Sequence, residues 1–398
     1  MNANPEIYLN QKKARNFTGH HPWILSHSVI QPTIELQAGT IVELVTPQGK
    51  WIARGIYNPA SRIRVRLYQW QQDEQLDAAW VQKQLSSAVS LRRIQADLSD
   101  ERLAVRLVNS EGDGLSGLIV DKFGSHVVVQ FTSLAMFKWK DAIVDCLNEQ
   151  LAPSEISLRI DEKTASNEGL EQLDTTSSGS PLPDEIEVEE NGIKLAIELQ
   201  SGQKTGYYLD QRKNRLAAAK WIRDGAMLDV CSYHGGFTLA ALRHGSPDSV
   251  RAVDSSAVAL ERLQKNAQLN GFENIDTVKA DCFDYLEQLA KSEERFQTIV
   301  LDPPRMAGNR NQVPAALRAY HRLNLSAVNS ILPGGILVTC SCSGRVSRAD
   351  FSGMLGSVSK RTRRPIQIVE MLGADFDHPV SVNCPETEYL KCFICRVG

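Results

Sequence analysis

The sequence predicts an α/β protein whose C-terminal half is a mostly parallel sheet with helices on both faces. A β-rich N-terminal domain and a small central α/β domain are predicted to precede it. Three observations support this prediction. The chain has 398 residues, which is enough for two or three domains. Short apolar segments alternate with amphipathic ones from about residue 186 onward, whereas the first 75 residues contain only short strand-like segments between turn signals.

The N-terminal and central parts each have their own pattern of elements. Residues 1–75 contain three predicted strands, at Thr40–Leu44, Trp51–Tyr57 and Ile63–Tyr68, and this spacing is typical of a small barrel or sandwich. Residues 76–185 are predicted to form a second domain that ends in a Ser- and Pro-rich linker at 174–185. Its predicted elements are a helix at 77–94, strands near Leu103–Val108, Gly117–Val120 and His126–Phe131, and a helix near Met136–Leu151.

The third part, residues 186–398, alternates strand and helix, which indicates a parallel sheet. Its apolar strands are predicted at Ala226–Val230, Val250–Val253, Thr277–Lys279, Thr298–Leu301 and Ile336–Thr339, with helical patterns between most of them. In such sheets, ligands bind beyond the carboxyl ends of the strands. The loops that follow these strands are therefore where the chemistry is expected.

Bulk properties limit the class of protein only broadly. The net charge of -3 neither supports nor excludes nucleic-acid binding, which would have to come from local patches. No apolar run is long enough to cross a membrane, and the N-terminus lacks a signal-peptide pattern. Eight cysteines without framework spacing are typical of a reducing compartment. We therefore expect a cytoplasmic protein without a membrane partner; whether it forms a homodimer stays open.

Acidic residues follow four consecutive predicted strands. The first loop joins an acid to a Gly-Gly pair that opens a helix, and its candidate ligand-binding residues are Asp229, Cys231, Ser232, Tyr233 and Gly235. The next loops carry Asp254, placed to accept from ribose hydroxyls, then Asp281 and Cys282 on the adenine side, then Asp302. Each Asp alone could be a helix N-cap. Four in this order favour an adenosyl cofactor.

These loops resemble those of class I methyltransferases that use S-adenosylmethionine (SAM). In that class an acid-plus-glycine loop, a ribose-binding acid, an adenine-side acid and a D/N-P-P segment lie on successive strands. Here the resemblance covers roughly residues 200–345, with Asp302-Pro303-Pro304 as the last segment. It implies a Rossmann-like catalytic domain with SAM as the cofactor and no metal.

Two cysteines follow the last of these strands. Cys340 and Cys342 are two residues apart, so on a continuing strand they would face the same way; the alternative is that both are small buried apolar residues. A thiolate at a methyltransferase site suits methylation of carbon 5 of a pyrimidine. Addition of sulfur at carbon 6 makes carbon 5 nucleophilic enough to accept the methyl group.

The segment around Cys342 resembles the GG-x-L-V-x-x-T-C-S segment of enzymes that make 5-methylcytosine in RNA. The resemblance places the nucleophile at Cys342 and implies that Asp302 hydrogen-bonds the cytosine edge. Those enzymes often carry a second cysteine where this chain has Arg305. The base that removes the carbon-5 proton is therefore left open, with Cys340 and a bound water as alternatives.

A longer segment, Gly202–Arg212 (GQKTGYYLDQR), resembles the signature of the RlmI-type family, which methylates carbon 5 of a cytosine in large-subunit (23S) ribosomal RNA. The resemblance implies a PUA RNA-binding domain, a central domain of EEHEE type and a methyltransferase domain. Departures from the family pattern are His234, Arg305 and the extra thiol of Cys340. Further segments that resemble the family are His21–Trp23, Ala53–Ser61, Asp377–Pro379, Tyr389–Lys391 and Cys395–Val397.

Several polar residues are predicted to contact the ligands. Tyr208 and Asp210 are expected at the cofactor, and Lys204, Arg212 and Arg215 at RNA phosphates, with an ion pair to Asp210 as the alternative for one of these three.

Other polar groups have plainer interpretations beside the functional ones. Arg62, Arg64 and Arg66 alternate along one strand, which suits either phosphate contacts or a charged strand edge. The cluster Lys360–Arg364 is interpreted as a solvated loop rather than an RNA contact. The Cys392–Cys395 spacing and the pair His20-His21 are interpreted as packing rather than metal sites.

The leading hypothesis is thus a ribosomal RNA cytosine-5 methyltransferase. The alternatives are a guanine-nitrogen methyltransferase of the same superfamily, a small-molecule methyltransferase, and a non-catalytic RNA-binding factor that keeps the fold.

Overall fold

The structure, a computed structural model, describes the chain except for residues 1–3, 11–18, 31–34, 178–182 and 200–205. The chain forms two compact units. The first comprises Met1–Ile186, Glu198–Tyr207 and Phe376–Thr387, and the second Glu187–Ile197, Tyr208–Asp375 and Glu388–Gly398. Within the described residues no helix is long and apolar enough to cross a membrane.

The N-terminal part of the first unit is a five-stranded sheet with the order β1-β3-β4-β5-β2. Its three longer strands lie within one residue of the predicted bounds. The two short ones were not predicted, because three residues show no recognisable period. Alternate apolar side chains such as Ile24, Val42 and Val65 build its own small core. The bounds are β1 Glu6–Tyr8, β2 Trp23–Leu25, β3 Ile41–Val45, β4 Trp51–Tyr57 and β5 Ile63–Gln69.

The central part of the first unit is a second five-stranded sheet, in the order β10-β9-β8-β7-β6, with its own apolar core. In chain order the elements of this sheet are β6, β7, β8, α2, α3, β9, α4 and β10, so the predicted EEHEE pattern is extended by β6 and interrupted by the short helices α2 and α4. The helix predicted near 136–151 is divided into α2 and α3, and the start of the predicted linker is strand β10. The bounds are α1 Ala78–Arg93, β6 Ala104–Asn109, β7 Leu118–Phe123, β8 His126–Phe131, α2 Leu134–Phe137, α3 Lys140–Leu151, β9 Glu155–Ile160, α4 Glu162–Glu168 and β10 Leu173–Thr176.

A segment from far along the chain, Phe376–Thr387, completes the first unit, although the sequence assigns it to the C-terminal domain. Arg92 is fully buried and forms a two-pronged ion pair with Asp113, with N···O distances of 2.6 and 2.7 Å. It also donates to the Asp377 carbonyl oxygen at 2.8 Å, and the Asp377 carboxylate accepts from the Arg106 backbone N–H at 3.0 Å. A buried guanidinium therefore anchors this segment.

The second unit is built on a seven-stranded sheet with the order β15-β14-β13-β16-β17-β19-β18. The first five strands are parallel, and β19 pairs antiparallel with both β17 and β18. A hairpin of β11 (Ile186–Glu190) and β12 (Ile193–Ile197) precedes the sheet. The strand bounds are β13 Ala226–Val230, β14 Ser249–Asp254, β15 Asp276–Lys279, β16 Phe296–Leu301, β17 Ile331–Ser341, β18 Ile366–Leu372 and β19 Lys391–Val397.

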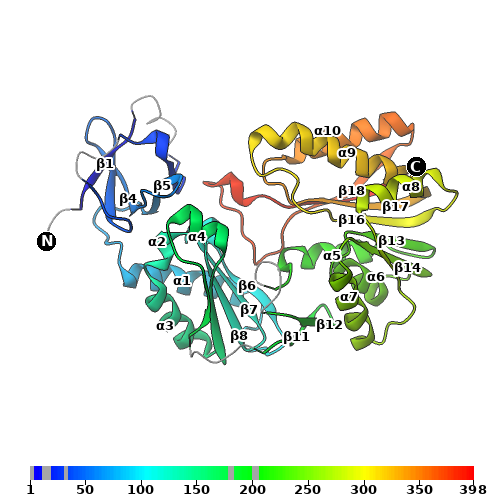
Figure 1. Cartoon of the computed structure of the whole chain (residues 1–398), viewed down its shortest axis with the longest axis horizontal. Helices are drawn as coiled ribbons and strands as arrows, with labels where there is room; N and C mark the ends of the chain where they lie inside the picture. Colours follow the sequence, from blue (N-terminus) through cyan, green and yellow to red (C-terminus); the bar gives the residue numbers. More distant parts are fainter. Residues whose placement is uncertain (1–3, 11–18, 31–34, 178–182, 200–205) are drawn as a thin grey trace. The chain divides into compact units, whose positions relative to one another are not determined.

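Helices cover both faces of this sheet (Figure 1), with α9 and α10 on one face and α6 and α7 on the other. Because the central strands are parallel, their carboxyl ends share one edge, which brings Asp229, Asp254, Asp302 and Cys342 to the same side of the sheet. The helix bounds are α5 Arg212–Ala219, α6 Gly236–His244, α7 Ala257–Leu269, α8 Cys282–Lys291, α9 Val313–Ser330 and α10 Arg348–Thr362.

Helix α10 was not predicted from the sequence, because its glycines and serines have low helix propensity. Its sequence signal is the capping box of Ser347 and Asp350, in which each side chain accepts from the other residue's backbone N–H. Lys360 and Arg361 lie on its last turn, so the predicted solvated loop begins as helix.

Candidate active site

A buried carboxylate, Asp229, lies near the carboxyl end of β13. Asp229 Oδ2 accepts from the backbone N–H and the hydroxyl of Thr238, at 3.1 and 2.8 Å, in the first turn of α6. Burial nevertheless raises the pKa of Asp229 to about 6. Its second oxygen, Oδ1, is buried and has no hydrogen-bond partner among the described residues. An unsatisfied buried carboxylate oxygen needs a donor, so the geometry suits a ligand amine or hydroxyl.

Asp254, at the end of β14, holds the neighbouring loop in place. Its two oxygens accept from the backbone N–H groups of Tyr233 and Ser256, each at 2.9 Å. Two non-glycine residues of the β13 loop, Cys231 and Tyr233, have φ of 62° and 49°. Such backbone is costly and persists only where the surroundings hold it, here through Asp254. Asp254 thus fixes the loop. Each of its carboxylate oxygens can accept a further hydrogen bond, for example from a ligand hydroxyl.

Gly235, which was predicted to bind the cofactor, also has a packing role. Its φ is 82°, and a Cβ there would lie 2.5 Å from Leu263 Cγ of α7, so the glycine permits helix packing. Shortly before this position, Ser232 Oγ and His234 Nδ1 are buried polar atoms without a partner among the described residues. The His234 ring stacks on Tyr233 at 3.7 Å, and burial lowers its pKa to about 4.

The loop after β15 contributes a cap and a thiol. Asp281 is the N-cap of α8 and accepts a hydrogen bond from Phe283 N–H at 2.8 Å. Its contacts therefore agree with the alternative interpretation of this residue as a helix cap. Cys282 opens the helix and hydrogen-bonds with Cys231; this bond lowers the pKa of Cys282 and raises that of Cys231. Two half-buried thiols therefore lie together between the β13 and β15 loops.

Asp302 follows β16 and is the acid whose pKa is raised furthest among those given a value. Its Oδ1 accepts from Gln211 Nε2 at 2.9 Å. Burial, then the charges of Asp210 and Asp229, raise its pKa to about 7, against the lowering effects of Arg215 and Gln211. The carboxyl can therefore carry a proton near neutral pH.

Tyr208 and Asp210 come from the segment around η4 (Leu209–Gln211). Tyr208 packs edge-on against Tyr233 at 5.2 Å, and its pKa is raised to about 12 by burial and then by the charges of Cys342, Asp210, Asp302 and Asp254. It therefore lies among the predicted site residues. Asp210 is buried and accepts from the Tyr389 hydroxyl at 2.6 Å, so this carboxylate is engaged by the protein itself.

Cys342 lies on the loop directly after β17 and is half-buried. Its Sγ is 3.8 Å from the Pro303 carbonyl oxygen, which places the thiol beside the loop that carries Asp302. Ser343 fixes the loop: its Oγ accepts from the backbone N–H groups of Met306 and Ala307 at 3.0 and 3.1 Å and bonds with the Tyr320 hydroxyl at 3.0 Å. The residue next to the thiol is thus held by three hydrogen bonds.

Lys391, in β19, lies close to the Cys342 loop, and no chemical role was predicted for it from the sequence. It is 1% exposed, and its Nζ donates to the carbonyl oxygens of Ser343 and Tyr389 at 2.7 and 2.8 Å. Burial lowers its pKa to about 8, with the charge of Cys342 acting in the opposite direction. Its only sequence signal is a lysine that opens an apolar strand.

Cys340 does not share the surroundings of Cys342. It is fully buried in β17, directly across from Cys392 of β19. Burial, and then its hydrogen bond with Cys392, raise the pKa of Cys340 well above its ordinary value. The strand ends at Ser341, so the two-residue period does not extend to Cys342. The plain interpretation of Cys340, a small buried residue, fits these contacts.

The predicted phosphate-binding residues have varied surroundings. Arg215 is a correction: it is buried and ion-paired with Glu190 at 2.7 Å, which leaves it unavailable to RNA. The alternative predicted from the sequence was an ion pair with Asp210, whereas the partner of Arg215 in this ion pair is Glu190. Arg212 is half-buried and lies 3.5 Å from Asp375. Lys204 lies outside the described residues.

The predicted arginine stripe of the N-terminal sheet is divided among three environments. Arg66 is buried, with Glu111 and Glu168 at 3.4 and 3.5 Å. Arg64 donates to backbone carbonyls of Asn58 and Pro59. Arg62 is exposed and lies just before β5. The three guanidinium groups therefore do not form one open face.

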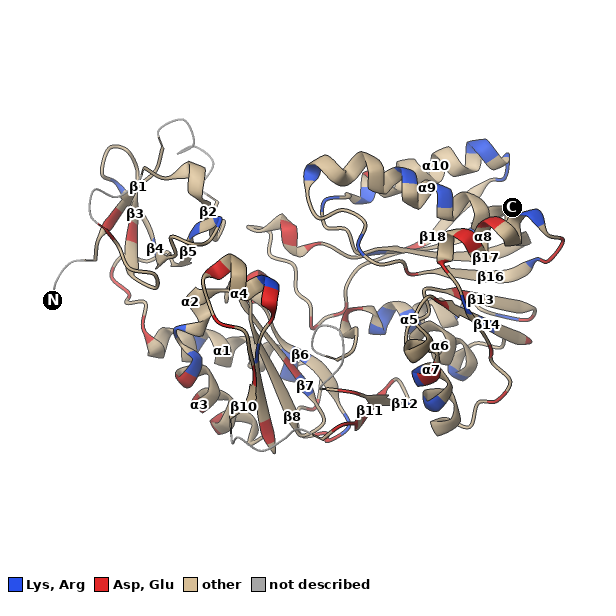
Figure 2. Ribbon diagram, viewed as in Figure 1, with Lys and Arg blue, Asp and Glu red and all other residues tan. Residues whose placement is uncertain are grey.

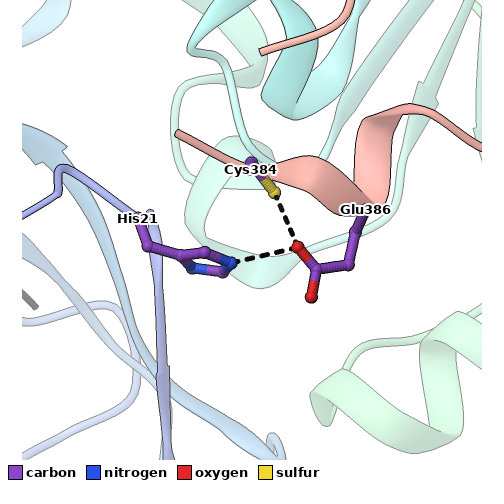
Figure 3. A group of neighbouring side chains, drawn as sticks. All are labelled: His21, Cys384 and Glu386. Atoms are coloured by element: carbon purple, nitrogen blue, oxygen red, sulfur yellow. Dashed lines mark hydrogen bonds and ion pairs between the residues drawn. The ribbon is translucent and has the colours of Figure 1, made fainter. Parts of the chain in front are cut away.

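Figure 3 shows a group of polar side chains within the first unit: His21, Cys384 and Glu386. One nitrogen, sulfur or oxygen atom of each, of the kind that can bind a metal ion, lies within 4.8 Å of the other two. His21 Nε2 is 3.2 Å from Glu386 Oε2, and Cys384 Sγ is 3.7 Å from the same oxygen. The Trp23 backbone N–H donates to His21 Nδ1 at 3.2 Å, so the neutral ring carries its proton on Nε2, facing Glu386. Hydrogen bonding alone accounts for the arrangement.

Family models match two parts of the chain. Residues 7–70 match a PUA-like domain, and residues 170–381 match an S-adenosylmethionine-dependent methyltransferase. Together with the acidic loops of the second unit, these matches define the class: a SAM-dependent methyltransferase that carries a PUA-like domain.

Curated relatives narrow the class to one family. The chain is 35% identical over 395 residues to ribosomal RNA large subunit methyltransferase I of Klebsiella pneumoniae, covering 99% of this chain and 98% of the relative. It is 34% identical over 393 residues to the protein of the same name from Aliivibrio fischeri, covering 98% and 99%. The chain belongs to this family, the RlmI family.

Solved structures share the fold. A protein from Streptococcus mutans described as a SAM-dependent methyltransferase has a TM-score of 0.82 at 18% identity, covering 98% of this chain and all of that one. A methyltransferase complexed with SAH has a TM-score of 0.83, also at 18% identity, with the same coverage. At this level of identity the similarity concerns the fold alone.

Proposed function

We propose that this protein methylates carbon 5 of a cytosine in large-subunit ribosomal RNA through a covalent adduct with Cys342. The observation that carries the proposal is the position of Cys342, half-buried on a fixed loop beside Asp302 at the edge of the sheet. The names of the curated relatives support ribosomal RNA as the substrate. A carbon-5 target is supported by the thiol, because methylation of nitrogen or oxygen needs no covalent activation.

The residues of the β13 and β14 loops fit the cofactor. Asp229 Oδ1 and Ser232 Oγ lack partners among the described residues and would hold polar groups of SAM, and Asp254 would hold the ribose. SAM supplies the methyl group. Asp281 and Cys282 would lie on the adenine side, although Asp281 also caps its helix.

The chain's own residues then account for substrate activation. The Cys342 thiolate adds to carbon 6 of the cytosine, and the carbon 5–carbon 6 double bond supplies the electron pair with which carbon 5 takes the methyl group. Loss of the carbon-5 proton and departure of the thiolate restore the double bond. Asp302, with its pKa near 7, is suited to donate a proton to the cytosine ring, which makes carbon 6 more electrophilic.

Nucleoside mass spectrometry tests the proposal directly. Unmodified large-subunit ribosomal RNA is incubated with SAM and either wild-type protein, Cys342→Ala or, as a matched control, Cys340→Ala. We expect 5-methylcytosine from wild type and from the control, and none from Cys342→Ala. A methylguanosine product, or an equally active Cys342→Ala variant, would contradict the covalent cytosine mechanism.

A further inference from the structure

One stretch of the second unit contains basic residues that are not balanced by acidic ones. Residues 303–369 contain ten lysines and arginines but only one acid, Asp350. The whole chain has 44 basic and 47 acidic residues, so the remainder holds 34 and 46. A stretch with a net charge of +9 therefore lies within a chain whose other residues sum to -12. This stretch includes α9, β17, the Cys342 loop and α10.

The helices of this stretch form one surface. Helices α9 and α10 pack side by side on the same face of the sheet, and Figure 2 shows lysines and arginines along both. Arg364 donates to the Ile331 carbonyl oxygen at 2.6 Å, which ties the chain after α10 to the end of α9. Burial and then the charge of Arg361 lower the pKa of His321 on α9. Arg361 of α10 therefore lies near His321 of α9.

Some of these cations are already engaged by the protein. Arg322 pairs with Glu287, Arg348 pairs with Glu388 at 2.7 Å, and Arg305 donates to carbonyls of its own loop. Four others, on α9, on α10 or directly after α10, are exposed and have no acidic partner among the described residues. We call these four the α9–α10 cation surface: Arg318, Lys360, Arg361 and Arg363.

We propose that the α9–α10 cation surface binds backbone phosphates of the RNA that flanks the target nucleotide. The proposal rests on the proposed function, because it takes RNA as the substrate. Exposed like charges without acidic partners repel one another, and an anionic partner relieves that cost. Phosphate contacts of this kind position a nucleic acid without reading its sequence.

The test compares two triple variants of the full-length protein. Lys360→Gln/Arg361→Gln/Arg363→Gln removes three charges from the surface. Lys220→Gln/Arg243→Gln/Lys265→Gln removes three exposed charges from α6, α7 and the residue after α5. Binding to an unmodified large-subunit ribosomal RNA transcript is measured by filter binding over a range of salt concentrations. Calorimetry with SAH checks that both variants keep the cofactor site.

The surface variant should bind RNA roughly ten-fold more weakly at moderate salt, and the magnitude of its log–log salt slope should fall by roughly 2–3 for three lost phosphate contacts. Its KM for RNA should rise while kcat stays unchanged. The control variant should behave as wild type. An unchanged salt slope, or an equal loss in the control, would overturn the proposal. If wild type binds RNA but makes no 5-methylcytosine, the proposed function fails. In that case, loss of RNA binding in the surface variant but not in the control would still support phosphate binding by the α9–α10 cation surface.

Discussion

Lys391 donates a hydrogen bond to the Ser343 carbonyl oxygen, 2.7 Å away, one residue beyond Cys342. This bond connects a buried ammonium group in β19 to the loop that carries the proposed nucleophile. The pKa of Lys391 is lowered to about 8, so the group is still mostly charged at neutral pH and loses its charge as the pH rises through 8. A cation held beside a thiol stabilises the thiolate, which is the reactive form. If Cys342 is the nucleophile, we expect Lys391 to position its loop and to favour the thiolate.

Replacing Lys391 by methionine should slow the reaction of Cys342 with iodoacetamide at pH 7 by about ten-fold, because less thiolate forms without the cation. The pH profile of alkylation should move to higher pH, and methyl transfer should fall in parallel. Lys391→Arg keeps the charge and should retain most of the reactivity. Alkylation is followed by peptide mass spectrometry at Cys342. A methionine variant that binds SAH and is alkylated at the wild-type rate would assign Lys391 a purely structural role.

Asp302→Asn should separate activity from stability. The folded-state pKa of about 7 lies above the ordinary value of 3.8, so the carboxylate destabilises the native state increasingly as the pH rises from about 4 to 7. At pH 8 the free energy of unfolding of the asparagine variant should exceed that of wild type by on the order of 1–3 kcal/mol, so the variant should unfold at a higher temperature. Near pH 4 the two proteins should be equally stable. Methyl transfer should drop by about 10²–10⁴-fold with loss of the proton donor.

Thermal unfolding at pH 4 and pH 8, beside single-turnover rates, checks both parts of the Asp302 prediction. In wild type the rate should also decline above pH 7 as Asp302 loses its proton. A rate that keeps rising through pH 8 would rule out the protonated carboxyl as the donor.

The fold of the second unit could largely be predicted from the sequence, because buried parallel strands read as short apolar runs separated by helical patterns. The five strands from β13 to β17 appear where those runs occur. By contrast, the return of Phe376–Thr387 to the first unit depends on Arg92, whose partners Asp113 and Asp377 lie far from each other in the sequence. A contact of this kind has no local signal.

The candidate site could be predicted from the sequence where its residues lie at the carboxyl ends of the predicted strands. Asp229, Asp254 and Asp302 all lie at the carboxyl edge of the sheet because each ends or follows a parallel strand. Arg215 was misread because its type suggested a phosphate ligand, whereas its partner Glu190 lies on a hairpin 25 residues earlier. Lys391 was overlooked because its importance comes from the pairing of β19 with β17, which a single sequence does not reveal.

Arg215 and Glu190 form a buried ion pair, so removing one partner should be costly. We expect Arg215→Gln to lower the free energy of unfolding by about 3–5 kcal/mol, because Glu190 is then left buried and unpaired. The double variant Glu190→Leu/Arg215→Met should recover much of that loss. Denaturant unfolding measures both. RNA affinity of the folded double variant should equal that of wild type, and a large loss of affinity would restore Arg215 as a phosphate ligand.

Substitution of Gly235 tests whether a glycine is required in the β13 loop for helix packing or for close approach to the cofactor. Gly235→Ala should cost roughly 1–3 kcal/mol through its clash with Leu263, in addition to roughly 1–2 kcal/mol for a Cβ at positive φ. It should also weaken SAH binding, because the start of α6 holds the bonds between Thr238 and Asp229. If packing is the cause, Gly235→Ala/Leu263→Ala should bind SAH as Leu263→Ala alone does in calorimetry. A folded double variant that still fails to bind SAH would show instead that a Cβ at position 235 obstructs the cofactor directly.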